Sequence, residues 1–253
     1  MNVLVACEES QAVCIAFREK GHRAFSCDII NCSGGHQEWH IMDDVLKVLR
    51  GGQFKTMDGR SHCISNWDMI IAFPPCTHLA VSGARHFEKK RKDGRQREGI
   101  EFFCKFLEVE CERVVIENPV GIISGDYIPK YFPDLAERFN LPKKPTQIIH
   151  PWMFGDNYSK STCLWEKGVK PLEPIVKVQP KLDWFEFTDR KTGKKKRQPK
   201  WYADALKLPA EERARVRSKT FPGIAKAMAE QWGELKAESE NDQEHESEEE
   251  ETK

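Results

Sequence analysis

Short apolar runs alternate with segments of helical periodicity through the first half of the chain, and this alternation restricts the fold more than any other feature. Strands are expected at residues 3–7, 24–28, 68–73 and 113–116. Helices are expected at residues 10–20, 44–49 and 99–109. Strands that alternate with helices form parallel sheets, because each crossover returns the chain to the same edge. The sequence therefore predicts an α/β fold with a Rossmann-like, doubly wound, mostly parallel sheet.

Changes in composition predict four segments: a core at 1–126, a small irregular second lobe at 127–201, helices that return to the core at 202–236, and an acidic tail at 237–253. The second lobe is rich in prolines, aromatic residues and basic residues and has no strong helical period. The tail has a low-complexity acidic composition, which predicts disorder.

Composition also predicts where the protein works. No apolar run is long enough to span a bilayer, and no basic segment precedes the first apolar residues. The nine cysteines are an odd number spread along the chain, which favours reduced thiols over a disulfide framework. We expect a monomeric cytoplasmic protein without a membrane partner.

The formal net charge of zero hides an uneven distribution. Residues 237–253 hold nine acidic residues and one lysine, which leaves 39 basic against 31 acidic residues before them. This excess predicts a surface that binds a polyanion. Two clusters are candidates for nucleic-acid binding. They are Lys89, Lys90, Arg91, Lys92 and Arg95, and then Lys195, Lys196 and Arg197 beside aromatic residues.

Two short motifs follow predicted strands and carry reactive side chains. Pro74 and Pro75 precede Cys76 after one strand, and Glu117 begins a Glu-Asn-Pro sequence after the next. The proline pair restricts the backbone ahead of the thiol. Taken alone, Cys76 could be a small buried hydrophobic residue, and Glu117 could cap a following helix. In parallel sheets strand ends share one edge, so the pair is a candidate nucleophile and acid.

These motifs resemble those of the DNA cytosine 5-methyltransferases, in which Pro-Pro-Cys carries the nucleophile and Glu-Asn-Val carries an acid. A compact, phage-type branch is more similar, through residues 5–8 (Val-Ala-Cys-Glu), 151–155 (Pro-Trp-Met-Phe-Gly) and 220–225 (Thr-Phe-Pro-Gly-Ile-Ala). The resemblance covers nearly the whole chain before the tail. It implies that Cys76 adds to carbon-6 of a cytosine flipped out of DNA while Glu117 supports ring nitrogen 3.

The resemblance further implies a seven-stranded fold and S-adenosylmethionine as the cofactor. It also implies a role in restriction-modification, in a bacterium or a phage-infected host cell. The core would then hold catalysis and cofactor, and the lobe would recognise the target. The residues implied to bind the cofactor are Cys7, Glu8, Ser10, Asp28, Asp44 and Pro74.

Two features depart from the family pattern. The cofactor loop has no glycine between Glu8 and Gly21, although glycines normally let the backbone approach the ligand. The Arg-x-Arg that helps position the base is absent from its usual place. Arg215 and Arg217 have the right spacing but lie close to the last helix, so we assign them no role.

Several alternatives remain open. Cys27, Cys32, His36 and His40 are spaced roughly like zinc ligands but match no standard site, so no metal is predicted. A zinc deaminase is disfavoured because its His-x-Glu and Pro-Cys-x-x-Cys elements are missing. The same chemistry could act on a free cytosine nucleotide. The chain could also be a catalytically silent protein that binds DNA or blocks restriction.

Overall fold

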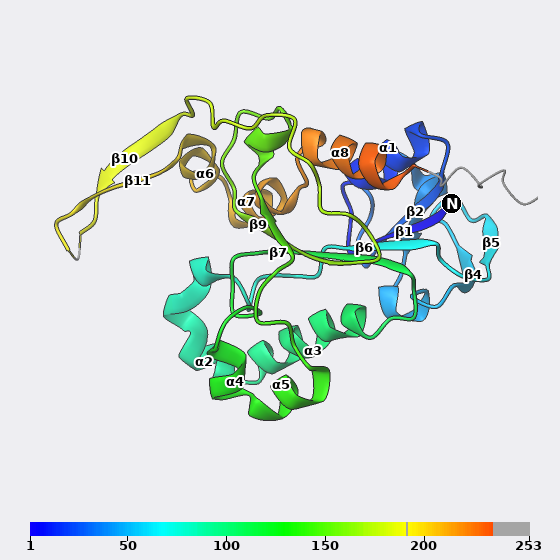
Figure 1. The fold of residues 1–253 in the computed structure, drawn as a ribbon, viewed down its shortest axis with the longest axis horizontal. Coiled ribbons are helices and arrows are strands. Elements are labelled where there is room, and N and C mark those ends of the chain that lie inside the picture. Colours follow the sequence, from blue (N-terminus) through cyan, green and yellow to red (C-terminus); the bar gives the residue numbers. More distant parts are fainter. Residues whose placement is uncertain (191, 235–253) are drawn as a thin grey trace, which may run out of the picture.

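The structure is a computed structural model that describes residues 1–190 and 192–234. The acidic tail that we predict to be disordered lies outside the described residues. A seven-stranded sheet forms the centre of the molecule (Figure 1). Its strands are β1 (Asn2–Ala6), β2 (Arg23–Asp28), β3 (His40–Met42), β6 (Met69–Ala72), β7 (Arg113–Pro119), β8 (Gln147–Ile149) and β9 (Thr162–Lys167).

The strand order is β3-β2-β1-β6-β7-β9-β8, with β9 antiparallel to both of its neighbours and the first five strands parallel. The predicted α/β fold with a mostly parallel sheet is therefore confirmed. The chain winds outward from β1 in both directions, so the order reverses between β1 and β6. Ligands of open α/β sheets bind beyond the strand ends at such a reversal.

Helices cover both faces of the sheet, as Figure 1 shows, and their bounds are α1 (Ala12–Glu19), α2 (Phe87–Lys92), α3 (Arg95–Leu107), α4 (Tyr127–Tyr131), α5 (Pro133–Phe139), α6 (Lys200–Ala205), α7 (Ala210–Ser218) and α8 (Pro222–Trp232). Short 3-10 segments are η1 (Gln37–Trp39), η2 (Val45–Lys47), η3 (Val81–His86) and η4 (Pro151–Phe154).

Alternation along the strands divides the core into two layers. Val3 and Val5 of β1 pack with α1 and α8 above the sheet, whereas Leu4 and Ala6 pack with α3, α4 and α5 below it (Figure 1). Successive strand side chains point to opposite faces, so a strand buried on both sides must be apolar throughout. This is why the continuous apolar runs identified the central strands.

The predicted second lobe differs from the observed one. Strands β8 and β9, which lie inside 127–201, belong to the central sheet, and α4 and α5 cover its lower face. What stands out from the body is the antiparallel hairpin of β10 (Trp184–Thr188) and β11 (Lys195–Pro199). A second hairpin joins β4 (Gly52–Lys55) and β5 (Ser61–Ile64). The helix predicted at 44–49 is a single 3-10 turn, η2.

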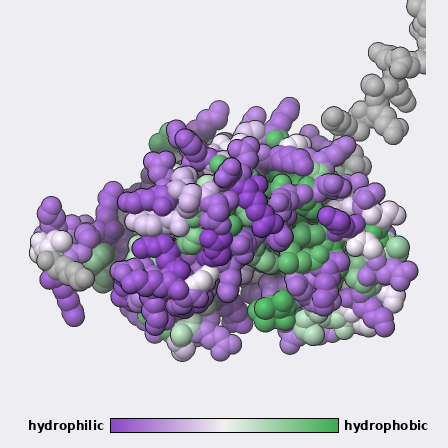
Figure 2. All heavy atoms as spheres, turned by 90° about the horizontal axis from the view of Figure 1, so that it is seen from below, coloured by the Kyte–Doolittle hydropathy of each residue, from purple (hydrophilic) through white to green (hydrophobic). Residues whose placement is uncertain are grey.

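Hydrophilic side chains dominate the lower face, and hydrophobic atoms appear there only in patches (Figure 2). The same view shows the β10–β11 hairpin projecting from the body. Within the described ranges, no helix combines the length and apolar character that a bilayer crossing requires. All nine cysteines are free thiols.

Candidate active site

The loop after β6 brings Cys76 to the edge of the sheet beside β1. The backbone N–H of Phe73 donates to the carbonyl of Ala6 at 2.9 Å, which extends the pairing of the two strands. Pro74 is buried next to this junction, and Cys76 is half-buried. The backbone N–H groups of Leu79 and Ala80 both donate to the Cys76 carbonyl at 2.9 Å. The thiol is thus held at the strand-order reversal by a closed turn.

Strand β7 supplies the acid and also fastens the cysteine loop. The Nδ2 group of Asn118, whose residue is only 1% exposed, donates to the Pro74 carbonyl at 2.9 Å. Glu117, the residue before it, is half-buried, and no described residue hydrogen-bonds to its carboxylate. Its neighbour on β9 is Leu164. Asn118 therefore has a structural role, while the Glu117 carboxylate is available to a ligand.

Electrostatic effects show that Cys76 and Glu117 lie close to each other. Burial raises the pKa of the Cys76 thiol, and the charge of Glu117 raises it further. Lys160 and Arg217 lower that pKa in return. Burial also raises the pKa of Glu117, and Lys160 again opposes the shift. The structure therefore brings together a thiol, a carboxyl group and two cations from four separate segments.

Sequence reasoning did not identify Lys160 and left Arg217 without a role. Lys160 lies in the loop before β9, where its Nζ donates to the Arg217 carbonyl at 3.3 Å and lies 5.9 Å from the centre of the Phe221 ring. No motif marks Lys160, because its place follows from the antiparallel return of β9 beside β7. The Arg-x-Arg spacing of Arg215 and Arg217 was the one available signal for the second cation.

Three of the predicted cofactor residues lie together at the ends of β1, β2 and β3. Burial raises the pKa of the Cys7 thiol, and the charges of Asp28 and Asp44 contribute to the shift. The Asp28 carboxylate accepts from the N–H of Ile30 at 3.3 Å, and burial raises its pKa. The Asp44 carboxylate accepts from the N–H of Leu46 at 3.0 Å, at the start of η2. Both carboxylates keep oxygen atoms that can accept further hydrogen bonds.

Exposed apolar side chains surround the two aspartates. Ile29 and Ile30 directly follow Asp28 and are 76% and 54% exposed. Met42, which pairs with Asp28 across β2 and β3, is 51% exposed. Carboxylates suit ribose hydroxyls, and an apolar surface suits a nucleobase. This edge of the sheet therefore fits a nucleoside, which is the larger part of S-adenosylmethionine.

Glu8 and Ser10 are placed differently from Asp28 and Asp44. The Glu8 carboxylate is buried and accepts from the N–H groups of Val13 and Cys14 at 2.7 and 3.2 Å, at the start of α1. Burial raises the pKa of Glu8 to about 8. Ser10 is also buried. Both residues shape the turn between β1 and α1, so a ligand at this turn would meet the backbone of Glu8 and Ser10 rather than their side chains.

The turn between β1 and α1 contains no glycine. Cys7 and Gln11 both adopt left-handed backbone conformations, each with φ of 58°, which cost energy for residues with side chains. Gln11 is completely buried, and its side-chain amide donates to the His36 carbonyl and accepts from the His36 N–H. Gln11, which sequence reasoning missed, therefore fixes the turn that glycines form in the family pattern.

Lys90 and Arg91 of the first basic cluster face inward. The Lys90 Nζ is buried and donates to the Thr77 carbonyl at 2.6 Å, and burial lowers its pKa. Arg91 donates to the Tyr127 hydroxyl at 2.8 Å and lies 4.0 Å from the centre of the Tyr131 ring. These two cations attach α2 to the cysteine loop and to α4.

Of the remaining cations of this cluster, Lys89 and Lys92 are exposed and Arg95 is half-buried. Lys92 forms an ion pair with Glu88 at 2.8 Å, and Arg95 forms one with Asp93. The Lys89 side chain makes no ion pair or hydrogen bond with any described residue. Lys89 is therefore the cation of this cluster whose side chain is most available to a polyanion.

The second cluster lies on β11 of the projecting hairpin. Lys196 forms an ion pair with Asp189 at 2.5 Å, and the Arg197 guanidinium lies 4.6 Å from the centre of the Trp184 ring. Lys195 is exposed, and its side chain makes no ion pair or hydrogen bond in the part of the chain that is described. The two basic clusters are thus on separate elements. No group of three metal-binding side chains gathers among the described residues.

Comparisons with known proteins give little further information. No protein-family model matches the chain, and no curated protein matches it. One similar solved structure is described as a DNA modification methyltransferase encoded within an E. coli prophage, with 15% identity, a TM-score of 0.41 and 83% of this chain covered. Another is the Entamoeba histolytica methyltransferase EhMeth, with 13% identity, a TM-score of 0.38 and 73% of this chain covered.

The chain spans only 56% and 58% of the lengths of these two proteins. What can be inferred about function therefore rests on this chain's own residues.

Proposed function

We propose that the protein transfers a methyl group from S-adenosylmethionine to carbon-5 of cytosine in DNA. The observation that carries this proposal is the pairing of Cys76 and Glu117, a thiol and an unpartnered carboxyl group at the ends of neighbouring parallel strands. The charge of Glu117 raises the pKa of Cys76, and the charge of Lys160 lowers the pKa of both groups, so the three side chains lie within electrostatic reach of one another. A thiol and an acid converging on one substrate can add to a pyrimidine ring.

Each step can be assigned to side chains of this site. The Cys76 thiolate forms a bond to carbon-6 of cytosine, and the electron pair of the carbon-5 to carbon-6 double bond moves to carbon-5. The Glu117 carboxyl group gives its proton to ring nitrogen 3. Carbon-5 would then take the methyl group as the bond from that group to the donor sulfur breaks. Loss of the carbon-5 proton to water, with return of the nitrogen-3 proton to Glu117, would expel the Cys76 thiolate and restore the ring.

The charges of the site support these roles. Burial raises the pKa of Glu117, which favours the protonated form that an acid catalyst needs. A protonated Glu117 has no charge, so it no longer raises the pKa of Cys76. Lys160 and Arg217 then favour the thiolate, which is the nucleophilic form of a cysteine. Protonating the acid therefore helps to ionise the nucleophile.

S-adenosylmethionine would supply the methyl group as an electrophile. Asp28 and Asp44 would hold its ribose and adenine side, with Ile29 and Ile30 against the base. The backbone from Cys7 to Ser10 would approach the amino-acid portion, and Pro74 lies between this turn and Cys76. Asp28 and Asp44 lie on one side of the β1–β6 reversal, and Cys76 lies on the other. The methyl donor and the cytosine would therefore meet at adjacent strand ends.

DNA is the proposed partner because the target atom is stacked inside a duplex and the body of the protein is basic. A flipped cytosine would enter between Cys76 and Glu117. Lys89 and Lys195 are the members of the two clusters best able to contact phosphates. A free cytosine nucleotide would need neither of these lysines.

A trapping experiment tests this proposal. We expect the protein to form a stable adduct with DNA containing 5-fluorocytosine in the presence of labelled S-adenosylmethionine, because fluorine prevents the final elimination. Cys76→Ser should form no adduct and transfer no methyl group, while keeping most of its affinity for DNA. Cys63→Ser, which changes an exposed thiol on β5, is the matched control and should behave like the wild type.

An adduct that persists in Cys76→Ser would refute the nucleophile assignment. Labelled methyl groups found in free deoxycytidine nucleotides but not in DNA would refute the assigned substrate. DNA binding without any binding of S-adenosylmethionine would instead identify a silent DNA-binding protein.

A further inference from the structure

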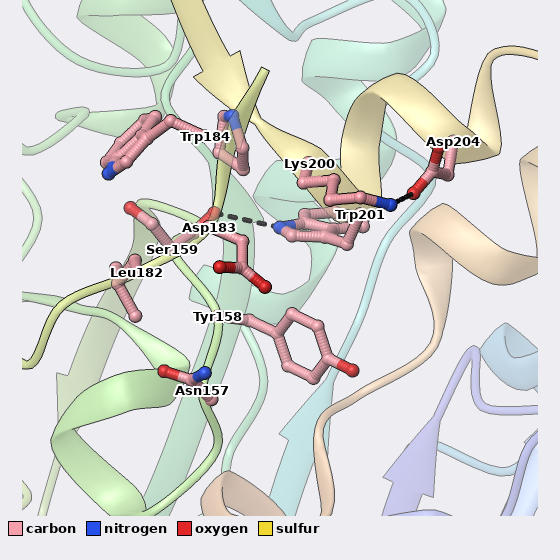
Figure 3. Close-up of a pocket in the computed structure, with 10 residues that line it drawn as sticks. Asn157, Tyr158, Ser159, Leu182, Asp183, Trp184, Lys200, Trp201 and Asp204 are labelled. Carbon is pink, nitrogen blue, oxygen red and sulfur yellow. Dashed lines mark hydrogen bonds and ion pairs between the residues drawn. The ribbon is translucent and has the colours of Figure 1, made fainter.

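A cavity of about 260 Å³ lies where the projecting hairpin joins the body. Its walls come from the loop 157–159, the base of β10 and β11, and the start of α6 (Figure 3). It is separate from the nucleoside edge formed by Asp28 and Asp44. A volume just below that of pockets for drug-sized ligands suits one flat ring system better than a complete cofactor.

Aromatic side chains form much of this cavity. Tyr158 is 42% exposed, and its ring lies 6.4 Å from that of Trp201 at an interplanar angle of 80°. The indole N–H of Trp201 donates to the Ser159 carbonyl at 3.1 Å, which fixes this wall (Figure 3). Trp184 lines the cavity from β10. Exposed aromatic faces of this kind stack on nucleobases without regard to sequence.

Two aspartates, Asp183 and Asp204, line the cavity, and they differ in their ion pairs. Asp204 forms ion pairs with Lys200 at 2.5 Å and with Lys207 at 2.8 Å, so its charge is balanced. The carboxylate of Asp183, an exposed residue, makes no ion pair or side-chain hydrogen bond with a described residue, although its charge reaches Lys200. Figure 3 shows this carboxylate pointing into the space beside Tyr158. A carboxylate accepts two hydrogen bonds side by side. The cavity is therefore built to receive a planar group with two adjacent N–H donors.

Guanine is the nucleobase that offers this pattern. Its Watson–Crick edge places the ring N1–H next to the exocyclic amino group, and both can donate to one carboxylate. Adenine and cytosine present an amino group beside an acceptor nitrogen, which a carboxylate would repel. A base read at its Watson–Crick edge must be unpaired.

The cavity is also close to the candidate active site. Tyr158 and Ser159 directly precede Lys160, the cation that influences both Cys76 and Glu117. The Arg197 guanidinium, stacked on Trp184, brings positive charge to the same wall for a nearby phosphate. We propose that this cavity binds an unpaired guanine of the DNA strand, with Asp183 reading its edge, Tyr158 stacking on its ring, and the nearly perpendicular ring of Trp201 forming a side wall. Assigning the guanine to DNA rests on the function proposed above.

Binding measurements on the full chain without cofactor test this inference. Fluorescence anisotropy would compare oligothymidylate strands carrying one guanine, one hypoxanthine or one adenine. Hypoxanthine keeps the N1–H but lacks the amino group, so we expect it to bind about tenfold more weakly than guanine. Asp183→Asn should abolish the preference for guanine over hypoxanthine. Asp126→Asn removes an exposed carboxylate on α4 below the sheet and should retain it.

Tyr158→Leu separates stacking from edge recognition, because it should weaken all three strands while preserving their order. Equal binding of guanine and hypoxanthine by the wild type would overturn the inference, as would a guanine preference that survives in Asp183→Asn. Guanosine 5′-monophosphate that competes as strongly as the guanine strand would overturn the assignment to DNA. Since no step uses Cys76, Cys76→Ser should keep the preference, so loss of methylation and loss of guanine binding are separate outcomes.

Discussion

At the scale of single residues, Lys160 links the two groups that carry the proposed chemistry. Its cation lowers the pKa of the Cys76 thiol and of the Glu117 carboxyl group, while Glu117 raises the pKa of the thiol. Changing the acid and changing the lysine should therefore affect the thiol in opposite directions.

We expect Glu117→Gln to lower the pKa of Cys76, because the variant removes the negative charge that an ionised Glu117 places near the thiol. We expect Lys160→Met to raise that pKa, because the variant removes a positive charge. The measurement is the pH dependence of iodoacetamide alkylation at Cys76, followed by mass spectrometry of its peptide. Lys20→Met, a lysine paired with Glu230 on the far side of α1, should leave the profile unchanged. Shifts of the same sign in Glu117→Gln and Lys160→Met would contradict this arrangement of charges.

How far sequence predicts single residues depends on whether their role is local. Three site residues come at the ends of strands that the sequence predicts: Cys76, Glu117 and Asp28. The alternation of strands and helices therefore predicted that they share one edge of the sheet. Glu8 was predicted to meet the cofactor, but whether its carboxylate turns outward or toward α1 is decided by the fold of the turn. The position of Lys160 depends on the antiparallel return of β9, and that of Asp183 depends on the β10–β11 hairpin. No sequence motif predicts either position.

At the scale of elements, α1 begins in an unusual way. Its N-cap residue, Gln11, provides no side-chain cap, and the carboxylate of Glu8 satisfies the first N–H groups from the preceding turn. Because Glu8 is buried, its pKa in the folded state is about 8, above its ordinary value of 4.5. A carboxyl group whose pKa is raised by folding stabilises the folded state most when it is protonated. Its contribution is complete below pH 4.5 and is lost as the pH rises through 8.

Glu8→Gln should remove this pH dependence. The free energy of unfolding of the wild type, relative to that of Glu8→Gln, should fall by on the order of a few kcal/mol between pH 5 and pH 9. Urea unfolding at both pH values measures the difference. Glu19→Gln, at an exposed position of the same helix, should show no comparable change. A difference that grows with pH would mean that the two N–H groups outweigh burial and hold Glu8 in its charged form.

The elements that sequence predicted are those buried on both sides. β1 and β6 were identified because a strand enclosed by two helical layers is a continuous apolar run. β2 was identified although it contains the buried polar residue Ser26, and β7 was identified from its apolar part before Glu117. β4 and β5 were missed because they form an isolated hairpin with exposed, polar residues. β9 does contain an apolar run from Cys163 to Trp165, but the prolines and basic residues around it concealed its place in the sheet.

At the scale of the whole molecule, the two basic clusters lie at the same end. Figure 1 shows α2 below the level of the sheet and the β10–β11 hairpin above it, both on the left. Lys90 and Arg91 already donate hydrogen bonds to other residues of the protein, so only the remaining cations of the clusters can contact a polyanion. Composition predicted the excess of positive charge, but it could not separate structural cations from available ones.

Lys89 and Lys195 should therefore carry a large part of the salt dependence of DNA binding, one from each cluster. If each contacts one phosphate, Lys89→Gln and Lys195→Gln should each reduce the slope of log affinity against log salt by about 0.9 for duplex DNA, and the double variant by about twice that. Lys20→Gln changes the net charge equally but neutralises a lysine paired with Glu230, so its slope should match the wild type. If Lys20→Gln lowered the slope as much as the other two, net charge alone would explain binding, and the assignment of DNA to this end would fail.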